Sequence, residues 1–167
     1  VSMNNISVLI SCLDSIIKYH DVEKYEIIVV AYLFSDENKT LLYKSYPWVK
    51  VLESDEIRGF SENNNLALRS AKGKYCLILN DDTYFVDNLL DKLIAVFEKN
   101  ENISLLSPVL YNTDDTIQFS GLYKLTFFFW LLNQINLGHL INSKYQNKQG
   151  LFKTYNISGA CFAIRKD

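Results

Sequence analysis

The sequence predicts an α/β fold in one domain, built on a mostly parallel sheet with helices on both faces. Three observations lead to this prediction. Short apolar runs of strand length alternate with stretches of helical spacing through residue 106. These runs are continuous, which is typical of strands that are buried on both faces. The chain has 167 residues, 49% of them hydrophobic, and this suits one domain with a sizeable core.

The expected elements follow one another in a regular order. The predicted strands cover residues 6–10, 26–30, 49–52, 75–79 and 103–106. Helices are predicted at 13–19, 39–46 and 63–71, and after Asp87, where one helical face carries Leu90, Leu93, Ile94 and Phe97. We expect Asp36 and Asp87 to cap the second and fourth helices, and Gly73 to lie just past the end of the third.

After residue 106 the alternation ends, and polar turns surround one aromatic-rich stretch, so the domain has an elaborated C-terminal third. The apolar run from Leu125 to Leu132 is too short to span a bilayer, which needs about 20 apolar residues. For the aromatic cluster Phe127 to Trp130 we expect ordinary core packing, rather than a cover over a ligand or contact with a membrane interface.

Composition and charge exclude several classes of protein. The formal net charge is −2, from 17 basic and 19 acidic residues, and no stripe of Lys and Arg marks a nucleic-acid binder. Cys12, Cys76 and Cys161 form no metal-binding or disulfide pattern, so we expect buried free thiols in a reducing compartment. No signal peptide is visible, which favours a cytoplasmic protein, including one attached to the inner face of a membrane.

The chemistry is expected where strands end, because ligands of open parallel sheets lie outside the carboxyl ends of the strands. The fourth predicted strand runs into Asn80-Asp81-Asp82-Thr83. Carboxylate and amide oxygens at this position suit a hard divalent cation such as Mg²⁺ or Mn²⁺. The alternative is an Asp-rich turn whose side chains cap the next helix, and these four residues alone favour the turn.

The surrounding motifs favour the metal site. The segments that carry a resemblance, in chain order, are Gly59-Phe60-Ser61-Glu62-Asn63-Asn64-Asn65, Gly73-Lys74-Tyr75, Asn80-Asp81-Asp82, Thr116-Ile117-Gln118-Phe119-Ser120-Gly121 and Ser158-Gly159-Ala160-Cys161-Phe162-Ala163-Ile164-Arg165. Together they resemble glycosyltransferase family two, in the order and spacing of its rhamnosyltransferase-like members. The resemblance covers nearly the whole chain and implies a GT-A fold. It also implies transfer of a sugar from a nucleoside diphosphate donor to a glycan or lipid-linked acceptor.

The resemblance assigns roles to the residues after the fourth strand. Asp82 aligns with the last acid of the family's DxD motif, and Asn80 with its first acid, so both are candidate ligands of Mn²⁺ or Mg²⁺. Asp81 occupies the variable middle position. The metal would neutralise the charge that develops on the leaving diphosphate. The resemblance also implies a role in polysaccharide biosynthesis at the cell envelope.

Two further groups are candidate binding residues. Arg58, Asn64 and Asn65 are expected at the turn before the third helix, where they contact the diphosphate or donor sugar or, equally, serve as helix caps and solvent-exposed residues. Ser158-Gly159-Ala160 resembles the segment beneath the donor sugar and acceptor, and a tight strand start is its alternative. On this reading residues 1–106 form the nucleotide-binding part of a single domain, and 107–167 form an incomplete acceptor-side part.

Three departures from the family pattern carry expectations of their own. The first strand is expected to run from Ile10 into a helix without the loop that cradles the base. Ala31 stands where the family places an Asp that reads the nucleoside. The catalytic base, which takes the acceptor's hydroxyl proton during inverting transfer, is expected beyond Asp167, because Asp114 and Asp115 are poorly placed for it.

The predicted function is therefore metal-dependent, inverting transfer of a hexose. The alternative is a non-catalytic nucleotide-sugar-binding or assembly module of the same fold, without the base. A nucleotidyltransferase or a NAD-linked oxidoreductase ranks lower, because no glycine-rich loop follows the first predicted strand.

Overall fold

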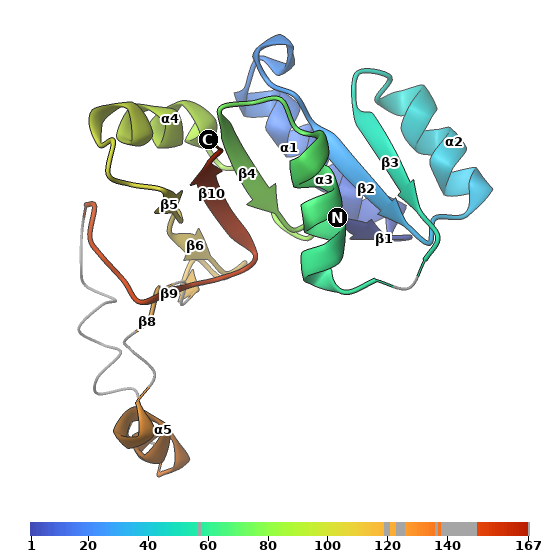
Figure 1. Ribbon diagram of the computed structural model, residues 1–167. Coiled ribbons are helices and arrows are strands. Elements are labelled where there is room, and N and C mark those ends of the chain that lie inside the picture. Colours follow the sequence, from blue (N-terminus) through green and yellow to red (C-terminus); the bar gives the residue numbers. More distant parts are fainter. Residues whose placement is uncertain (57, 119–120, 123–125, 136, 138–149, 167) are drawn as a thin grey trace. The chain divides into compact units, whose positions relative to one another are not determined.

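In the computed structural model of the chain, strands and helices alternate through residue 106 (Figure 1). The structure describes residues 1–56, 58–118, 121–122, 126–135, 137 and 150–166. Its elements are, in order, β1 (Ser2–Met3), α1 (Ile6–Tyr19), the 3₁₀ turn η1 (Val22–Lys24), β2 (Ile28–Tyr32), α2 (Asp36–Ser45), β3 (Lys50–Ser54), α3 (Phe60–Ser70), β4 (Tyr75–Leu79), α4 (Leu89–Lys99), β5 (Leu105–Leu106), β6 (Leu110–Tyr111), β7 (Ile117–Gln118), β8 (Gly121–Leu122), α5 (Phe127–Gln134), β9 (Asn156–Ile157) and β10 (Cys161–Arg165).

These elements belong to two compact units. One consists of residues 1–106 and 163–167, and the other of residues 107–162. The first unit holds a parallel sheet in the order β1-β2-β3, whose register pairs Ser2 with Ala31 and Ile28 with Lys50. A second sheet has the order β4-β10-β5, and β5 pairs with β10 in the antiparallel direction.

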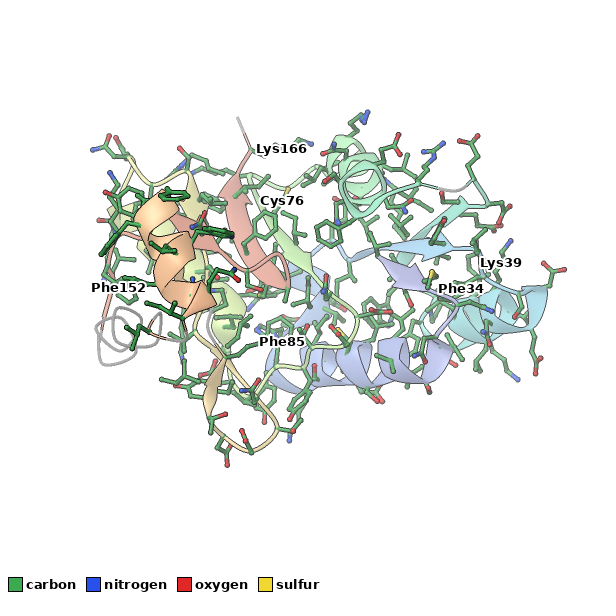
Figure 2. The ribbon with its side chains drawn as sticks, turned by 90° about the horizontal axis from the view of Figure 1, so that it is seen from below. Phe34, Lys39, Cys76, Phe85, Phe152 and Lys166 are labelled. Carbon is green, nitrogen blue, oxygen red and sulfur yellow. The ribbon has the colours of Figure 1, made fainter. Side chains whose placement is uncertain are left out.

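The core of the first unit lies between the parallel sheet and its helices. In Figures 1 and 2, α1 lies on one face of β2 and α3 on the other, as expected for strands buried on both faces. Val30, Ala31 and Leu42 are almost completely buried. Phe34 and Phe85, labelled in Figure 2, belong to the same apolar cluster as the buried face of α1.

The apolar run at residues 6–10 is helical, so the strand predicted there is wrong. Its buried residues continue along one helix face at i, i+3, i+4 and i+7, namely Leu9, Cys12, Leu13 and Ile16. A five-residue apolar run fits a strand and a helix turn equally well, and the longer spacing decides between them. The first strand is instead Ser2–Met3, and Asn4 and Asn5 connect it to α1. The expected junction of a strand end with a helix at Ile10 is therefore wrong, because Ile10 lies inside α1.

The helix ends differ from the sequence prediction: α2 and α3 each begin three residues earlier than predicted, and the caps of α2 and α4 lie one residue away from the predicted ones. Ser35, not Asp36, caps α2, because its hydroxyl accepts a hydrogen bond from the backbone N–H of Asn38 at 3.3 Å. Asn88, not Asp87, caps α4, because its side-chain oxygen accepts a hydrogen bond from the backbone N–H of Asp91. Helix α3 ends at an extended Ala71, and so Gly73 takes no left-handed C-terminal role.

Helix α5, in the second unit, contradicts the expectation of core packing for the aromatic cluster. The side chains of Phe127, Phe128 and Trp130 are 77%, 66% and 54% exposed. Phe127 and Trp130 stack on each other, with ring centroids 5.8 Å apart. An eight-residue helix with apolar residues all round cannot bury every side against one neighbour. In the described part of the chain, no helix is long and apolar enough to cross a membrane.

Candidate donor and metal site

The turn that follows β4 carries the three candidate donor-site residues. Asn80 and Asp81 are half-buried, while Asp82 is exposed. The turn is closed by Thr83, whose hydroxyl donates to the carbonyl oxygen of Asn80 at 2.7 Å. The Asn80 carbonyl is thus already occupied within the turn, and the side-chain oxygens of all three residues remain as metal-binding atoms.

Helix α1 contacts this turn through two small side chains, those of Ser15 and Cys12. The Ser15 hydroxyl accepts a hydrogen bond from the backbone N–H of Phe85 at 2.9 Å and donates to the Cys12 carbonyl at 2.6 Å. The Cys12 thiol lies 4.0 Å from the Asn80 carbonyl oxygen. Burial, together with the nearby carboxylate of Asp81, raises the pKa of Cys12 to about 11. Cys12 is therefore a neutral thiol that packs beneath the turn.

The carboxylates of Asp81 and Asp82 are free to take a cation. Among the described residues, neither forms a hydrogen bond or an ion pair. A hard divalent cation prefers such oxygen atoms and commonly completes its shell with water and substrate phosphate. The described residues contain no cluster of three or more His, Cys, Asp or Glu side chains that could enclose a metal alone. The donor set thus fits an open site that is shared with a diphosphate.

In the segment before α3, Arg58 is bound to Glu56, whereas the sequence made it a candidate contact of the diphosphate or donor sugar. The guanidinium group donates twice to Glu56, with an Nη2–Oε2 distance of 2.6 Å and an Nε–Oε2 distance of 3.1 Å. This hydrogen bonding and the charge of Glu56 raise the pKa of Arg58 above its ordinary value. Arg58 can neutralise a diphosphate only after it leaves Glu56, an exposed partner whose loss costs little.

The three consecutive Asn residues lie inside α3, because the helix begins at Phe60 and not at Asn63. Asn64 donates to the Phe60 carbonyl at 2.9 Å, and Asn65 is exposed. Asn63, which was not a predicted site residue, is 2% exposed and connects β3 to the start of α3. Its side chain accepts from the Ser54 hydroxyl and donates to the Arg58 carbonyl. Gly59 caps α3 without a side-chain hydrogen bond from the described residues, which leaves the first-turn N–H groups available to an anion.

The turn after β1 contains Asn4, a candidate site residue that the sequence prediction missed. Asn4 has a φ of 49°, and its side-chain oxygen accepts from the backbone N–H of Ser35 and the side chain of Asn38. Leu33, just after the neighbouring strand β2, is also left-handed, with a φ of 52°. Left-handed non-glycine residues are uncommon and cluster at functional sites. Ala31 is fully buried within β2, so it supplies no polar contact to a nucleoside.

The candidate acceptor-side residues lie in the second unit. Ser158, Gly159 and Ala160 form the turn that leads into β10, and the Ser158 hydroxyl accepts from the backbone N–H of Ala160 at 3.2 Å. Hydrogen bonds from Thr116 hold the pKa of the Asp114 carboxyl below its ordinary value, which makes it a weaker base. Asp115 is a left-handed turn residue, with a φ of 62°. Asp167 lies outside the described residues.

Solved structures share this architecture. A mannosyltransferase from Pyrobaculum calidifontis, in complex with GDP-Man and Mn²⁺, is 20% identical, with a TM-score of 0.56 over 68% of this chain and 34% of its own. TarS 1–349 from S. aureus is 19% identical, with a TM-score of 0.62 over 75% of this chain and 38% of its own. The fold is therefore that of a GT-A glycosyltransferase.

Sequence comparison identifies the family. The model of the family described as Glycosyl transferase family 2 matches residues 1–167, and the chain belongs to that family. An uncharacterized glycosyltransferase from Haemophilus influenzae is 29% identical over 83 residues, which are 49% of this chain and 28% of that protein. The chain thus matches about a third or less of the length of this relative and of the mannosyltransferase. These findings confirm the predicted resemblance and the predicted fold.

Proposed function

We propose that this chain forms the donor-binding part of an enzyme that moves a hexose from a nucleoside diphosphate sugar to a glycan or lipid-linked acceptor. The observation that carries the proposal is the turn after β4, with the carboxylates of Asp81 and Asp82 free of partners in the described residues. Membership of the family supports glycosyl transfer in general. The Mn²⁺ and GDP-Man bound to the similar mannosyltransferase support a metal and a nucleotide donor.

In this proposal Asp82 and the side chain of Asn80 hold Mn²⁺ or Mg²⁺, with Asp81 beside them. The bound cation would supply charge neutralisation for the departing diphosphate. Asn80 carries no charge, so the negative charge of this turn comes from the carboxylates of Asp81 and Asp82. The free N–H groups at the start of α3 add further stabilisation of an anion at low cost, because they are preorganised.

Inverting transfer also requires a base for the acceptor's hydroxyl proton. Asp114 does not suit this role, because Thr116 donates two hydrogen bonds to its carboxylate and favours the charged, weakly basic form. We place the base outside the described residues, with Ser158, Gly159 and Ala160 on the acceptor side. A role in polysaccharide biosynthesis at the inner face of a membrane would bring the exposed aromatic side chains of α5 near lipid.

A second candidate function is a non-catalytic module that binds or assembles around a nucleotide sugar. The burial of Ala31 within β2 favours it, because no acid stands there to read the nucleoside. The pairing of Arg58 with Glu56 favours it too, since the cation is engaged within the protein. This alternative predicts nucleotide binding without sugar transfer.

Isothermal titration of the chain with UDP, dTDP and GDP, each with and without Mn²⁺, tests the proposal. We expect one nucleotide to bind only with Mn²⁺, and Asp82→Asn to weaken that binding on the order of 10–100-fold. Asp87→Asn is the matched control, since Asp87 lies in the same loop but is paired with Lys92, and it should leave binding unchanged. If a nucleotide binds equally well without Mn²⁺ and to Asp82→Asn, the proposed metal site is wrong, while the proposed binding of a nucleotide donor stands.

A transfer assay with labelled donor then separates the two functions. Turnover supports the enzyme, and tight binding without turnover in a chain that includes the acceptor side supports the binding module. If no nucleotide binds under any condition, the assignment of the turn after β4 as a donor site is wrong.

A further inference from the structure

The loop between β4 and α4, residues 80–88, carries the candidate metal ligands, and α1 holds it through two polar side chains. The first is that of Ser15, whose hydroxyl accepts a hydrogen bond from the backbone N–H of Phe85 at 2.9 Å. The second is that of His20, whose Nε2 accepts from the backbone N–H of Leu90 at 3.2 Å. One contact thus lies just after the candidate ligands, and the other lies where α4 begins.

His20 is suited to hold the start of α4 because both of its ring nitrogens have partners. The side chain is buried, and Nδ1 lies 3.1 Å from the carbonyl oxygen of Ile16. A carbonyl oxygen only accepts and a backbone N–H only donates, so the two contacts together require the proton on Nδ1. The N–H of Leu90 belongs to the first turn of α4, where N–H groups have no partner within the helix. The ring also packs edge-on against Phe85, with ring centroids 4.9 Å apart.

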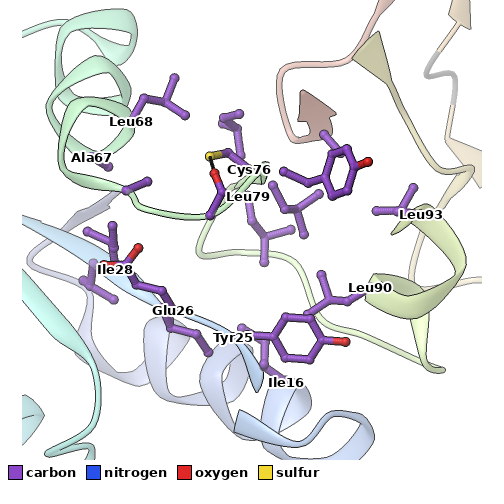
Figure 3. A pocket seen from close by; sticks show the side chains of 18 of the residues that line it. Ile16, Tyr25, Glu26, Ile28, Ala67, Leu68, Cys76, Leu79, Leu90 and Leu93 are labelled. Atoms are coloured by element: carbon purple, nitrogen blue, oxygen red, sulfur yellow. Dashed lines mark hydrogen bonds between the residues drawn. The ribbon is translucent and has the colours of Figure 1, made fainter. Parts of the chain in front are cut away.

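Apolar packing alone does not fix the distance between α1 and this loop. An apolar cavity of about 370 Å³ lies beside their contacts, and its lining includes Phe85 as well as Ile16 and Leu90, which are labelled in Figure 3. Protein interiors are close-packed, so side chains around a space of this size have fewer contacts than a filled core provides. Hydrogen bonds are directional, and the two bonds from α1 therefore define where the loop lies.

We propose that Ser15 and His20 are positioning residues of the metal site, which hold the loop so that Asp81 and Asp82 present their carboxylates to the same cation. Neither is a ligand, and each acts through the backbone of the loop. The inference rests on the proposed metal role of Asp82. Ligands on one loop bind a cation well only where the loop is preorganised, and the loss of an outer contact at a metal site costs about 10–100-fold in affinity.

Mn²⁺ alone is the probe for the Ser15 contact, and electron paramagnetic resonance of the free ion measures its affinity for the chain and its variants. Ser15→Ala removes the acceptor of the Phe85 N–H and should weaken Mn²⁺ binding about tenfold. Ser15→Thr keeps the hydroxyl and should restore the affinity. Ser11→Ala is the matched control, because the Ser11 hydroxyl donates to the Ser7 carbonyl within α1, and it should leave the affinity unchanged.

A pair of substitutions tests the His20 contact. In His20→Gln the side-chain oxygen can reach the Leu90 N–H in place of Nε2, whereas in His20→Asn the shorter side chain can replace only the Nδ1 contact with Ile16. His20→Asn should therefore weaken Mn²⁺ binding more than His20→Gln, since both lose the same ring. Leu42→Ala, at a fully buried position of α2, controls for lost stability, and it should lower the urea midpoint without a change in Mn²⁺ affinity.

Asp82→Asn separates this inference from the proposed function. If the chain binds Mn²⁺ and Asp82→Asn loses it, the metal site stands, and an unchanged affinity in Ser15→Ala would overturn the positioning role alone. Equal affinities of His20→Asn and His20→Gln would overturn the role of His20. A loss in Leu42→Ala as large as in Ser15→Ala would assign the effect to stability and overturn it too. If the chain binds no Mn²⁺, or Asp82→Asn binds it equally well, the proposed metal site fails and the positioning role fails with it.

Discussion

The two units of this chain use their apolar residues in opposite ways. In the first unit, Ala31, Leu42 and Phe97 are fully buried between helices and strands. In the described part of the second unit, Cys161 is the one side chain buried to that degree, while Phe127, Phe128 and Trp130 on α5 are exposed. The strands there are two residues long, except β10, which both units share. Hydrophobic residues thus form a core only where enough elements surround them, whatever the local composition.

The largest expected effect tests this difference with one substitution in each unit. Phe97 is fully buried and stacks on Tyr75 with ring centroids 4.8 Å apart. Phe97→Ala should lower the free energy of unfolding by about 3–5 kcal/mol, because it leaves a cavity. Phe127→Ala removes an exposed ring and should change it by less than about 0.5 kcal/mol. Urea denaturation measures both, and a similar loss for Phe127→Ala would show that α5 is packed in solution.

A smaller effect is expected at the cation that ties β10 into the first unit. Arg165 donates to the Phe97 carbonyl at 2.8 Å, to the Tyr75 hydroxyl at 3.2 Å and to the Ile103 carbonyl at 3.4 Å. Arg165→Met keeps the aliphatic stem but leaves these acceptors without their donor, and it should cost about 1.5–3 kcal/mol by urea denaturation. The exposed Arg69 is the control, and Arg69→Met should stay within about 0.5 kcal/mol. Equal losses would mean that the Arg165 contacts add nothing to β10.

The smallest effect concerns the alkaline range of pH. Burial raises the pKa of Cys12 from 9.0 to about 11, so the folded chain keeps its proton between these values while the unfolded chain loses it. The unfolded state then binds fewer protons, and stability falls as pH rises above 9. We expect a loss of about 1 kcal/mol between pH 9 and 10, as a one-unit shift is worth ~1.4 kcal/mol. Cys12→Ala should flatten this slope. An unchanged slope in the variant would assign the loss to other groups.

Strands with clear boundaries were predictable from the sequence. Strand β4 is found at the predicted residues 75–79, because a polar residue or glycine flanks the apolar run on each side. The run at 6–10 was misread, since five apolar residues do not define a period. Strand β10 could not be foreseen as a neighbour of β4, because pairing between residues so distant in the chain leaves no local pattern.

The candidate site was predictable where it depends on chain position and not where it depends on side-chain conformation. The turn of Asp81 and Asp82 follows a strand end and is found there. The engagement of Arg58 by Glu56 depends on rotamers of two exposed side chains. Three adjacent Asn residues look alike in the sequence, and only the direction of α3 decides that Asn63 is the buried one.

The place of β10 beside β4 also sets an order of events during synthesis. Lys166 donates its backbone N–H to the Lys74 carbonyl at 2.8 Å, and its ammonium group bonds to the carbonyls of Leu68 and Ala71. At about 5–20 residues per second, the ribosome reaches this segment on the order of 4–16 s after it has made β4. Through that interval the nascent chain holds an unpaired apolar strand.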